Sequence, residues 1–143
     1  MVEARSVATT GNSSDRRAAM HLTFLGKESH PKQSPTLFAT DRDSYVVQGW
    51  IVTDPEVLAM IAVSDDETIV EVPAALLAHF AKDGLSGDVV NLVPPIVHIT
   101  ANGNYIIRGR RVTDPDALAQ MTIPDHETCV EVSRSAITAL VGG

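Results

Sequence analysis

The sequence is poor in aromatic residues and in cysteine, and it lacks a long apolar run. It has only one Trp, two Tyr and three Phe among 143 residues, so its core must be built from Val, Ile, Leu and Ala. The single cysteine, Cys129, excludes an internal disulfide and fits a reducing compartment. No apolar run approaches the ~20 residues that a membrane-spanning helix needs. We therefore expect a soluble, cytoplasmic protein without a membrane anchor.

Positive charge is also scarce, and the acidic excess is unevenly placed. The formal net charge is −7, and residues 34–80 hold eight acidic side chains against one basic side chain. Such a surface is repelled by phosphate backbones and attracted by basic protein surfaces. Arg108, Arg110 and Arg111 form the one basic cluster of the region expected to be folded, and Arg108 and Arg110 share a strand face. We expect no direct nucleic-acid binding; an intramolecular contact with the acidic half is at least as good an interpretation.

The chain repeats itself. Residues 34–80 align with residues 94–140 without a gap, and 16 of the 47 pairs are identical. The densest match is the sequence VTDP, at residues 52–55 and again at residues 112–115. Repeated units usually pack on one another, and a unit of about 47 residues is close to the lower limit for an independent core. The repeat therefore predicts two units that share one core.

Each unit is predicted to contain two strands, a short helix, a strand and a closing helix. Alternating apolar residues and turn signals predict these elements. The expected fold is α+β, with two tandem ββαβα units packed as an intrachain pseudo-twofold pair with an antiparallel sheet. The predicted strands include residues 36–40, 45–52, 68–72 and 128–132, and the short helices residues 55–61 and 115–121.

The predicted domain boundaries follow the repeat. Residues 1–21 are assigned to a disordered N-terminal tail because they are polar and lack apolar periodicity. Met20 is an alternative to Met1 as the functional start. Residues 22–81 form the first unit with a leading segment, residues 82–93 the linker, and residues 94–143 the second unit.

Two pairs of repeated residues have structural interpretations. Asp54 and Asp114 precede a proline at the start of a predicted helix, where an aspartate caps free backbone N–H groups. Gly49 and Gly109 recur inside a strand, where glycine indicates a bulge or the close approach of a neighbouring backbone. We assign all four residues a structural role.

Other polar residues are candidates for contact with a partner. Glu71 lies inside an apolar strand and either faces solvent or recognises a basic group. Asp65, Asp66 and Glu67 are adjacent carboxylates, which fit a solvated turn better than a metal cage. Trp50 aligns with Arg110, so both are expected to point outwards, and an exposed tryptophan is a typical anchor of a protein contact.

Parts of the first unit resemble a known group of proteins. The relevant segments are residues 34–50 (SPTLFATDRDSYVVQGW), 52–55 (VTDP) and 70–73 (VEVP). They are similar to small actinobacterial proteins of unknown function that are associated with genes for helix-turn-helix regulators. The resemblance implies an accessory role in regulation and provides no catalytic residues.

Two functions remain open from the sequence. The first is a non-enzymatic acidic protein-interaction module, an accessory or antagonist of a transcriptional regulator with a basic surface. It is expected to be a monomer or weak homodimer, with no catalytic residue, cofactor or metal. The expected contact residues are Trp50, Asp65, Asp66, Glu67, Glu71, Arg108 and Arg110.

The alternative is a small-ligand-binding protein or an enzyme that uses the cleft between the repeats. His126, Cys129 and Glu131 would then cluster in that cleft. Against this, Cys129 replaces Ile69 of the first unit and fits a buried thiol. His126 and Cys129 also lack a second pair with zinc-ligand spacing.

Overall fold

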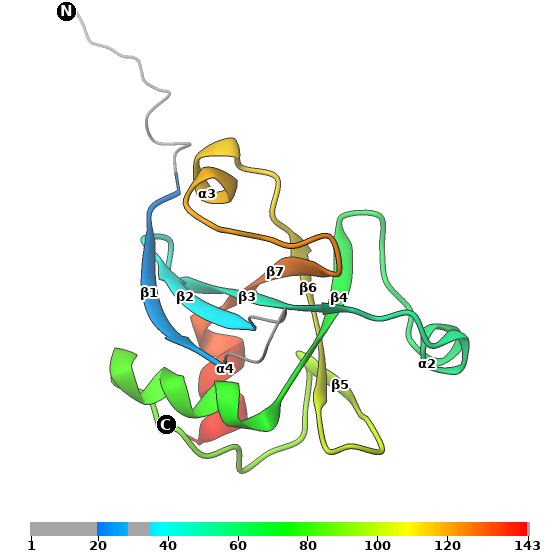
Figure 1. Ribbon diagram of the computed structural model, residues 1–143. Helices are drawn as coiled ribbons and strands as arrows, with labels where there is room; N and C mark the ends of the chain where they lie inside the picture. The colour runs from blue at the N-terminus through cyan, green and yellow to red at the C-terminus, as the bar shows by residue number, and fades with distance from the viewer. Residues whose placement is uncertain (1–19, 29–34, 143) are drawn as a thin grey trace, which may run out of the picture.

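The fold is mixed α+β, dominated by a seven-stranded antiparallel sheet with short helices around it (Figure 1). The computed structural model describes residues 20–28 and 35–142. Most of the predicted tail, residues 1–19, lies outside the described residues. The strands are β1 (Leu22–Lys27), β2 (Thr36–Thr40), β3 (Ser44–Ile51), β4 (Glu67–Val72), β5 (Ile96–Ile99), β6 (Tyr105–Arg111) and β7 (Glu127–Ser133). The helices are α2 (Pro55–Met60), the 3₁₀ helix η2 (Ala74–Asp83), α3 (Pro115–Ala119) and α4 (Arg134–Val141).

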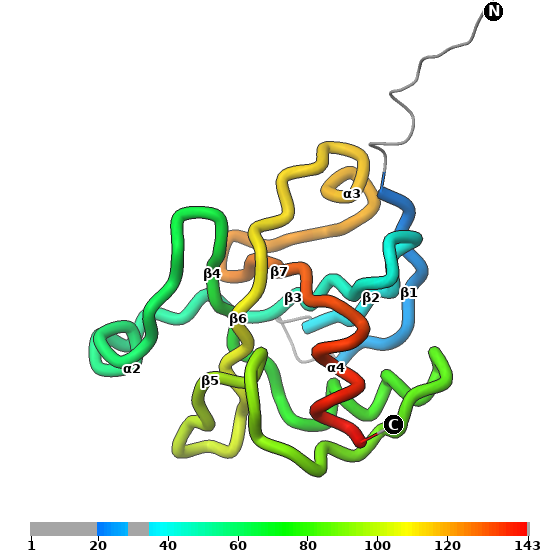
Figure 2. Tube along the Cα trace, turned by 180° about the vertical axis from the view of Figure 1, so that it is seen from behind, coloured from blue at the N-terminus to red at the C-terminus, as the bar shows by residue number. Residues whose placement is uncertain are grey.

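The sheet interleaves the first and second halves of the chain. β3 pairs with β7 from Ser44–Ser133 to Trp50–Glu127, and β4 pairs with β6 from Glu67–Arg110 to Val72–Tyr105. Shorter pairings of β3 with β4 and of β6 with β7 close a ring of four strands. Outside the ring, β2 and then β1 extend the sheet beside β3, and β5 extends it beside β6 (Figure 2).

The repeated glycines lie where two strands come too close for a side chain. A Cβ atom on Gly49 would be 2.5 Å from the carbonyl oxygen of Glu71. A Cβ atom on Gly109 would be 2.6 Å from the carbonyl oxygen of Glu131. The predicted close approach of a neighbouring backbone is therefore confirmed at both positions.

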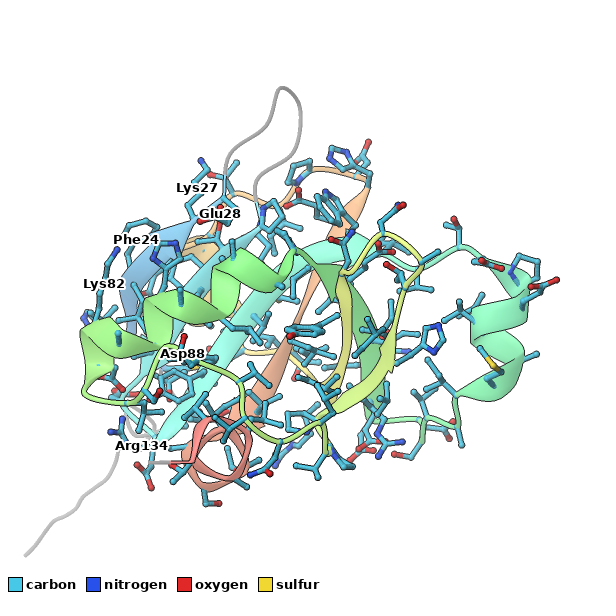
Figure 3. All side chains as sticks on the ribbon, turned by 90° about the horizontal axis from the view of Figure 1, so that it is seen from below. Phe24, Lys27, Glu28, Lys82, Asp88 and Arg134 are labelled. Carbon is cyan, nitrogen blue, oxygen red and sulfur yellow. The ribbon has the colours of Figure 1, made fainter. Side chains whose placement is uncertain are left out.

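One face of the sheet is covered by η2 and α4. Figure 3 shows η2 lying over β1 and β2, whereas α2 stands at the opposite end of the molecule. The core beneath is mainly aliphatic, as predicted, with Tyr45 and Phe80 in edge-to-face contact at 4.8 Å between ring centroids. Its buried members come from both halves of the chain, from Leu25 to Val141.

Three distant elements meet at the hydroxyl of Tyr45. This hydroxyl donates to Oδ2 of Asp83 at 2.6 Å and accepts from Nη1 of Arg134 at 2.8 Å. Arg134 also forms an ion pair with Asp83. Burial and the adjacent Asp83 carboxylate raise the pKa of Tyr45 well above its usual range. The neutral phenol therefore joins β3, η2 and α4.

Most local elements begin and end near their predicted positions. The strand predicted at residues 36–40 matches β2, and the helices predicted from residues 55 and 115 begin at Pro55 and Pro115. Asp54 and Asp114 accept hydrogen bonds from the backbone N–H groups of Glu56 and Asp116, which confirms both as caps. In the described part of the chain, no helix has the length and apolarity to cross a bilayer.

Candidate functional site

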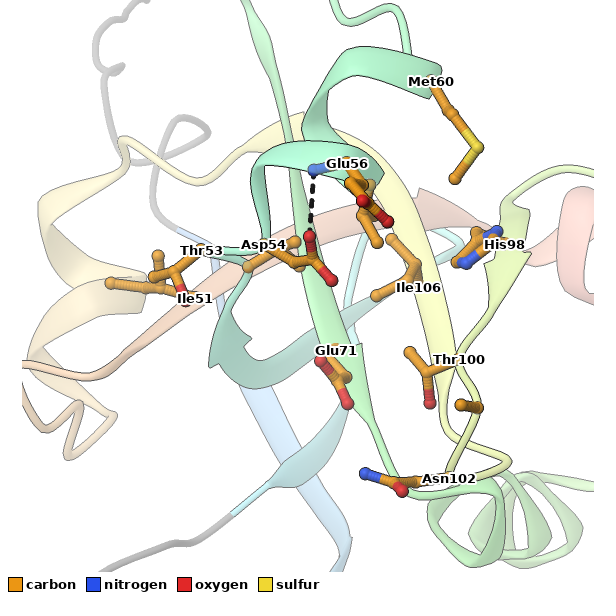
Figure 4. Close-up of a pocket in the computed structure, with 13 residues that line it drawn as sticks. Ile51, Thr53, Asp54, Glu56, Met60, Glu71, His98, Thr100, Asn102 and Ile106 are labelled. Atoms are coloured by element: carbon orange, nitrogen blue, oxygen red, sulfur yellow. Dashed lines mark hydrogen bonds between the residues drawn. The ribbon is translucent and has the colours of Figure 1, made fainter.

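A pocket of about 480 Å³ opens between α2, the end of β3 and the β5–β6 hairpin (Figure 4). We call it the α2 pocket. β3 leads directly into the cap of α2, so Asp54 and Glu56 are fixed at one side, while β4 and the hairpin supply the other. The lining residues are Ile51, Val52, Thr53, Asp54, Glu56, Val57, Met60, Glu71, His98, Thr100, Ala101, Asn102 and Ile106.

The α2 pocket is acidic. Its lining includes the carboxylates of Asp54, Glu56 and Glu71, and, within the described residues, neither lysine nor arginine. The imidazole of His98 faces them from β5 (Figure 4). Carboxylates that share a concave surface add their fields, so the pocket attracts cationic groups.

Asp54 has hydrogen-bonding capacity to spare. Its Oδ1 accepts the backbone N–H of Glu56 at 2.9 Å and so caps α2. Among the described residues, its Oδ2 has no hydrogen-bond partner. A carboxylate oxygen accepts more than one hydrogen bond. Asp54 can therefore receive an additional donor without giving up its cap.

Glu71 is held in place on the wall of the α2 pocket. Its neighbours along β4, Val70 and Val72, are buried in the core, so the alternation of the strand directs Glu71 to the opposite face. Its Oε2 accepts from Nδ2 of Asn104 at 2.8 Å. The carboxylate is thus fixed, half-buried, beside the pocket.

Apolar side chains form the floor and rim of this corner. The floor is a small cluster of Val52, Val57, Ile69 and Ile106. Several large apolar side chains around it are exposed, and Met60 on α2 is 62% exposed. The exposed residues near α2 are Ile51, Leu58, Met60, Val63 and Ile99. Acidic groups beside an exposed apolar rim can bind a ligand that carries both cationic and apolar groups.

A second corner, at α3, has similar residues but is filled. Asp114 caps α3 through Oδ1, while its Oδ2 accepts the backbone N–H of Met20 at 2.9 Å and Nη2 of Arg42 at 3.3 Å. Gln120 accepts the N–H of Leu22 at 3.0 Å and donates to the carbonyl oxygen of Met20 at 2.8 Å. Met20, which lies within the predicted tail, is only 3% exposed.

The loop that precedes β4 and contains Asp65 and Asp66 is contacted by the arginine cluster of β6. Nη1 of Arg108 donates to the carbonyl oxygen of Ala62 at 3.0 Å, and Nε of Arg111 donates to that of Asp65 at 3.2 Å. A hydrogen bond from Ser64, its backbone environment and the charge of Arg110 lower the pKa of Asp66. Glu67 lies opposite Arg110 in the sheet. The proposed intramolecular contact of Arg108 and Arg111 with the acidic half is confirmed.

The prediction that Trp50 points outwards is wrong. The residue is only partly exposed, and its indole N–H is buried without a hydrogen-bond partner among the described residues. Trp50 pairs with Glu71 on one side and Glu127 on the other, at the crossing of three strands. Trp50 is therefore partly buried where β3 pairs with both β4 and β7, whereas its counterpart Arg110 is exposed as predicted.

His126, Cys129 and Glu131 do not form a cluster. Cys129 is 4% exposed among apolar side chains of the α3 corner, and burial raises its thiol pKa to about 11. Oε2 of Glu131 accepts a hydrogen bond from the hydroxyl of Ser44 at 2.5 Å. Nε2 of His126 lies 3.6 Å from Oε2 of Glu127. The described residues contain no group of three or more His, Cys, Asp or Glu that could hold a metal. The predicted clustering of these three residues is therefore wrong, while the small-ligand function itself stays a prediction.

Of the residues that line the α2 pocket, only Glu71 is a predicted contact residue, while Asp54 is predicted as a helix cap. Glu56, Met60, His98 and Asn102 were not singled out. A usable signal lies in the positions at which the two aligned segments differ: Met60 stands opposite Gln120, and Asn102 stands opposite Arg42. Comparison with family models, with curated proteins and with solved structures finds no significant match.

Proposed function

We propose that the protein is a non-enzymatic acidic protein-interaction module, which binds a basic segment of a partner in the α2 pocket. The observation that carries this proposal is the set of three lining carboxylates, Asp54, Glu56 and Glu71, without a lysine or arginine among the described lining residues. The partner is proposed to be a transcriptional regulator, for which the protein acts as an accessory or antagonist. The resemblance of residues 34–50 to regulator-associated proteins supports that part.

We also infer that the chain is a tandem duplication of two ββαβα units related by a pseudo-twofold axis. In β3 and β7, Gly49 pairs with Thr128. In β6 and β4, the residues that align with these two, Gly109 and Thr68, also pair with each other. Both glycines meet the backbone of the neighbouring strand in the same way. On this proposal the α2 and α3 corners are equivalent places.

A charge reversal with a matched control tests the interaction function. Glu56 and Asp116 occupy the same position on α2 and α3, and both side chains are exposed. The tagged chain is used to capture proteins from its host, and a captured partner is identified and purified. Glu56→Lys is expected to weaken binding to that partner at least about tenfold, because it places a cation at the pocket.

Asp116→Lys is expected to leave the affinity within about threefold, although it disturbs the helix start to the same degree. Equal affinity of both variants would overturn the proposed site. Failure to capture any partner, together with a saturable thermal shift caused by one of a set of metal ions or metabolites, would instead support the alternative of a small-ligand protein.

A further inference from the structure

We propose that the α2 pocket receives an extended, basic peptide segment of a partner protein, which adds as a strand to the free edge of β5. The inference rests on the proposed interaction function and specifies its binding mode. The template is the α3 corner of the same molecule, where the chain's own β1 lies beside β2.

β5 offers an edge for pairing. It pairs with β6 on one side, and no strand of the described chain lies on the other side. The N–H of Thr100 is bonded to the carbonyl oxygen of Asn104, so the alternation of the ladder directs the N–H and C=O groups of Ile99 outwards. Ile99 is 39% exposed. Such an edge can bind an extended peptide through main-chain hydrogen bonds.

The α3 corner shows what occupies the corresponding edge. β1 pairs antiparallel with β2 from Leu22–Thr40 to Lys27–Thr36. The segment enters the corner at Met20, whose N–H is bonded to Oδ2 of Asp114. Met20 and Leu22 then fill an apolar cluster with Phe38, Val46, Ala117 and Cys129. The added strand is thus held by its backbone, by one carboxylate and by two apolar side chains.

The α2 corner repeats this arrangement without the strand. In the alignment of the two copies, Val46, Ala117 and Cys129 correspond to Ile106, Val57 and Ile69. These three belong to the α2 cluster, which contains no side chain from an added strand. Asp54 corresponds to Asp114, and its Oδ2 has no partner in the described chain. The place that Met20 and Leu22 fill at α3 is the α2 pocket.

Two differences between the corners specify the ligand. At α3, the guanidinium of Arg42 lies 3.3 Å from Asp114, but the residue that corresponds to Arg42 near Asp54 is Asn102. On this proposal, a cationic side chain of the ligand takes the place of Arg42. Gln120, which clamps the backbone of β1, corresponds to the exposed Met60, which favours apolar contact. The expected ligand is therefore extended, with an apolar side chain followed or preceded closely by Arg or Lys.

The chain supplies a probe with these features. Residues 16–27 (RRAAMHLTFLGK) join two arginines to the β1 sequence. The peptide is synthesised with blocked ends, and a scrambled peptide of the same composition serves as its control. Binding to the full chain is measured by isothermal titration calorimetry, and the amide signals of residues 96–100 are followed by NMR.

Three variants separate the binding mode from the binding site. Ile99→Pro removes the outward N–H and blocks strand addition. Ile99→Ala also removes the isoleucine side chain but keeps the N–H, so it serves as the control. Glu56→Lys disturbs the charge of the pocket. The probe is expected to bind, to lose at least about tenfold in affinity with Ile99→Pro and with Glu56→Lys, and to change by less than about threefold with Ile99→Ala. Thermal unfolding confirms that each variant is folded.

Any other result of these measurements contradicts the proposed strand addition. Binding that survives Ile99→Pro but is lost with Glu56→Lys overturns strand addition and leaves the interaction function standing. Equal binding of the scrambled peptide, or no binding of the probe, also overturns the inference, while capture of a partner through the α2 pocket still tests the function independently. A free protein that is dimeric and becomes monomeric with Ile99→Pro would identify a second copy as the occupant and overturn the partner proposal.

Discussion

Cys129 lies on β7 among the apolar side chains of the α3 corner, and this position governs its chemistry. In an unfolded chain a cysteine thiol ionises with a pKa of about 8.5. In the folded protein, burial raises the pKa of Cys129 to about 11 because the thiolate loses its hydration. The folded state therefore retains the thiol proton over a range of pH in which the unfolded state loses it.

The stability of the protein is expected to fall at alkaline pH on account of this thiol. Below about pH 8.5 both states are protonated, and above it the unfolded state gains the free energy of ionisation first. Between pH 8 and pH 10.5, the free energy of unfolding should fall by about 2 kcal/mol more in the protein with Cys129 than in a Cys129→Val variant. Urea denaturation of both proteins across this range measures the difference.

The Cys129→Val control cancels the contribution of Tyr45, whose pKa is also raised. Parallel pH profiles for the two proteins would contradict the burial of the thiol. The substitution is close in volume, so it should leave the fold intact.

The sequence predicted a residue well where its environment is local and poorly where distant strands decide it. Glycine, for example, is required at Gly49 and Gly109 whichever strand approaches, so both could be assigned a close backbone contact. The environment of Trp50 depends on the crossing of β3 with β4 and β7. Alternation along one strand cannot reveal that crossing, so the indole was wrongly expected at the surface.

At the scale of elements, α2 and α3 are short helices with the same start and different surroundings. Each begins with an Asp-Pro pair, and each aspartate accepts a backbone N–H of the first turn. Asp114 additionally holds the N–H of Met20 and the guanidinium of Arg42. The cap of α3 is thus also an attachment point for β1.

Replacing the two aspartates should therefore have unequal effects. Asp54→Ala is expected to lower the free energy of unfolding by about 1 kcal/mol, as expected for a lost helix cap. Asp114→Ala should lower it by about 2 kcal/mol, because the hydrogen bond from Met20 is lost as well. The ion pair with Arg42, whose side chain is 40% exposed, adds little. Chemical denaturation of both variants provides the comparison, and equal losses would show that β1 is not anchored by Asp114.

Element boundaries could be predicted because the rules that set them act within a few residues. An aspartate before proline marks the starts of α2 and α3, and alternating valines mark β4 and β7. The sequence did not show that residues 96–100 would lie beside α2, because that contact joins segments about forty positions apart. The α2 pocket therefore depends on how α2, β4 and the β5–β6 hairpin lie together in space (Figure 4).

At the scale of the whole molecule, the two halves do not form separate cores. The main partner of β3 is β7, and the main partner of β4 is β6. The buried core likewise takes residues from both halves, among them Tyr45, Phe80, Ile107 and Ile137. Both halves of the chain therefore contribute strands to one interleaved sheet.

Fragments that separate the halves should consequently fail to fold alone. Residues 20–87 would lose the strand that pairs with Ser44–Trp50, and residues 88–143 would lose the strand that pairs with Tyr105–Arg110. Each fragment is expected to give the circular dichroism and narrow amide NMR dispersion of an unfolded chain. An equimolar mixture should recover native-like dispersion. A fragment with a dispersed spectrum by itself would contradict the interleaved sheet.

The interleaving of β3 with β7 also makes folding a unimolecular event. Two separate chains with these strands would have to meet at a rate set by their concentration, and would come apart on dilution. The segment of residues 84–95 between the halves instead keeps the strands at an effective concentration in the millimolar range. The pairing of β3 with β7 is therefore independent of the protein concentration, and dilution does not separate the two halves.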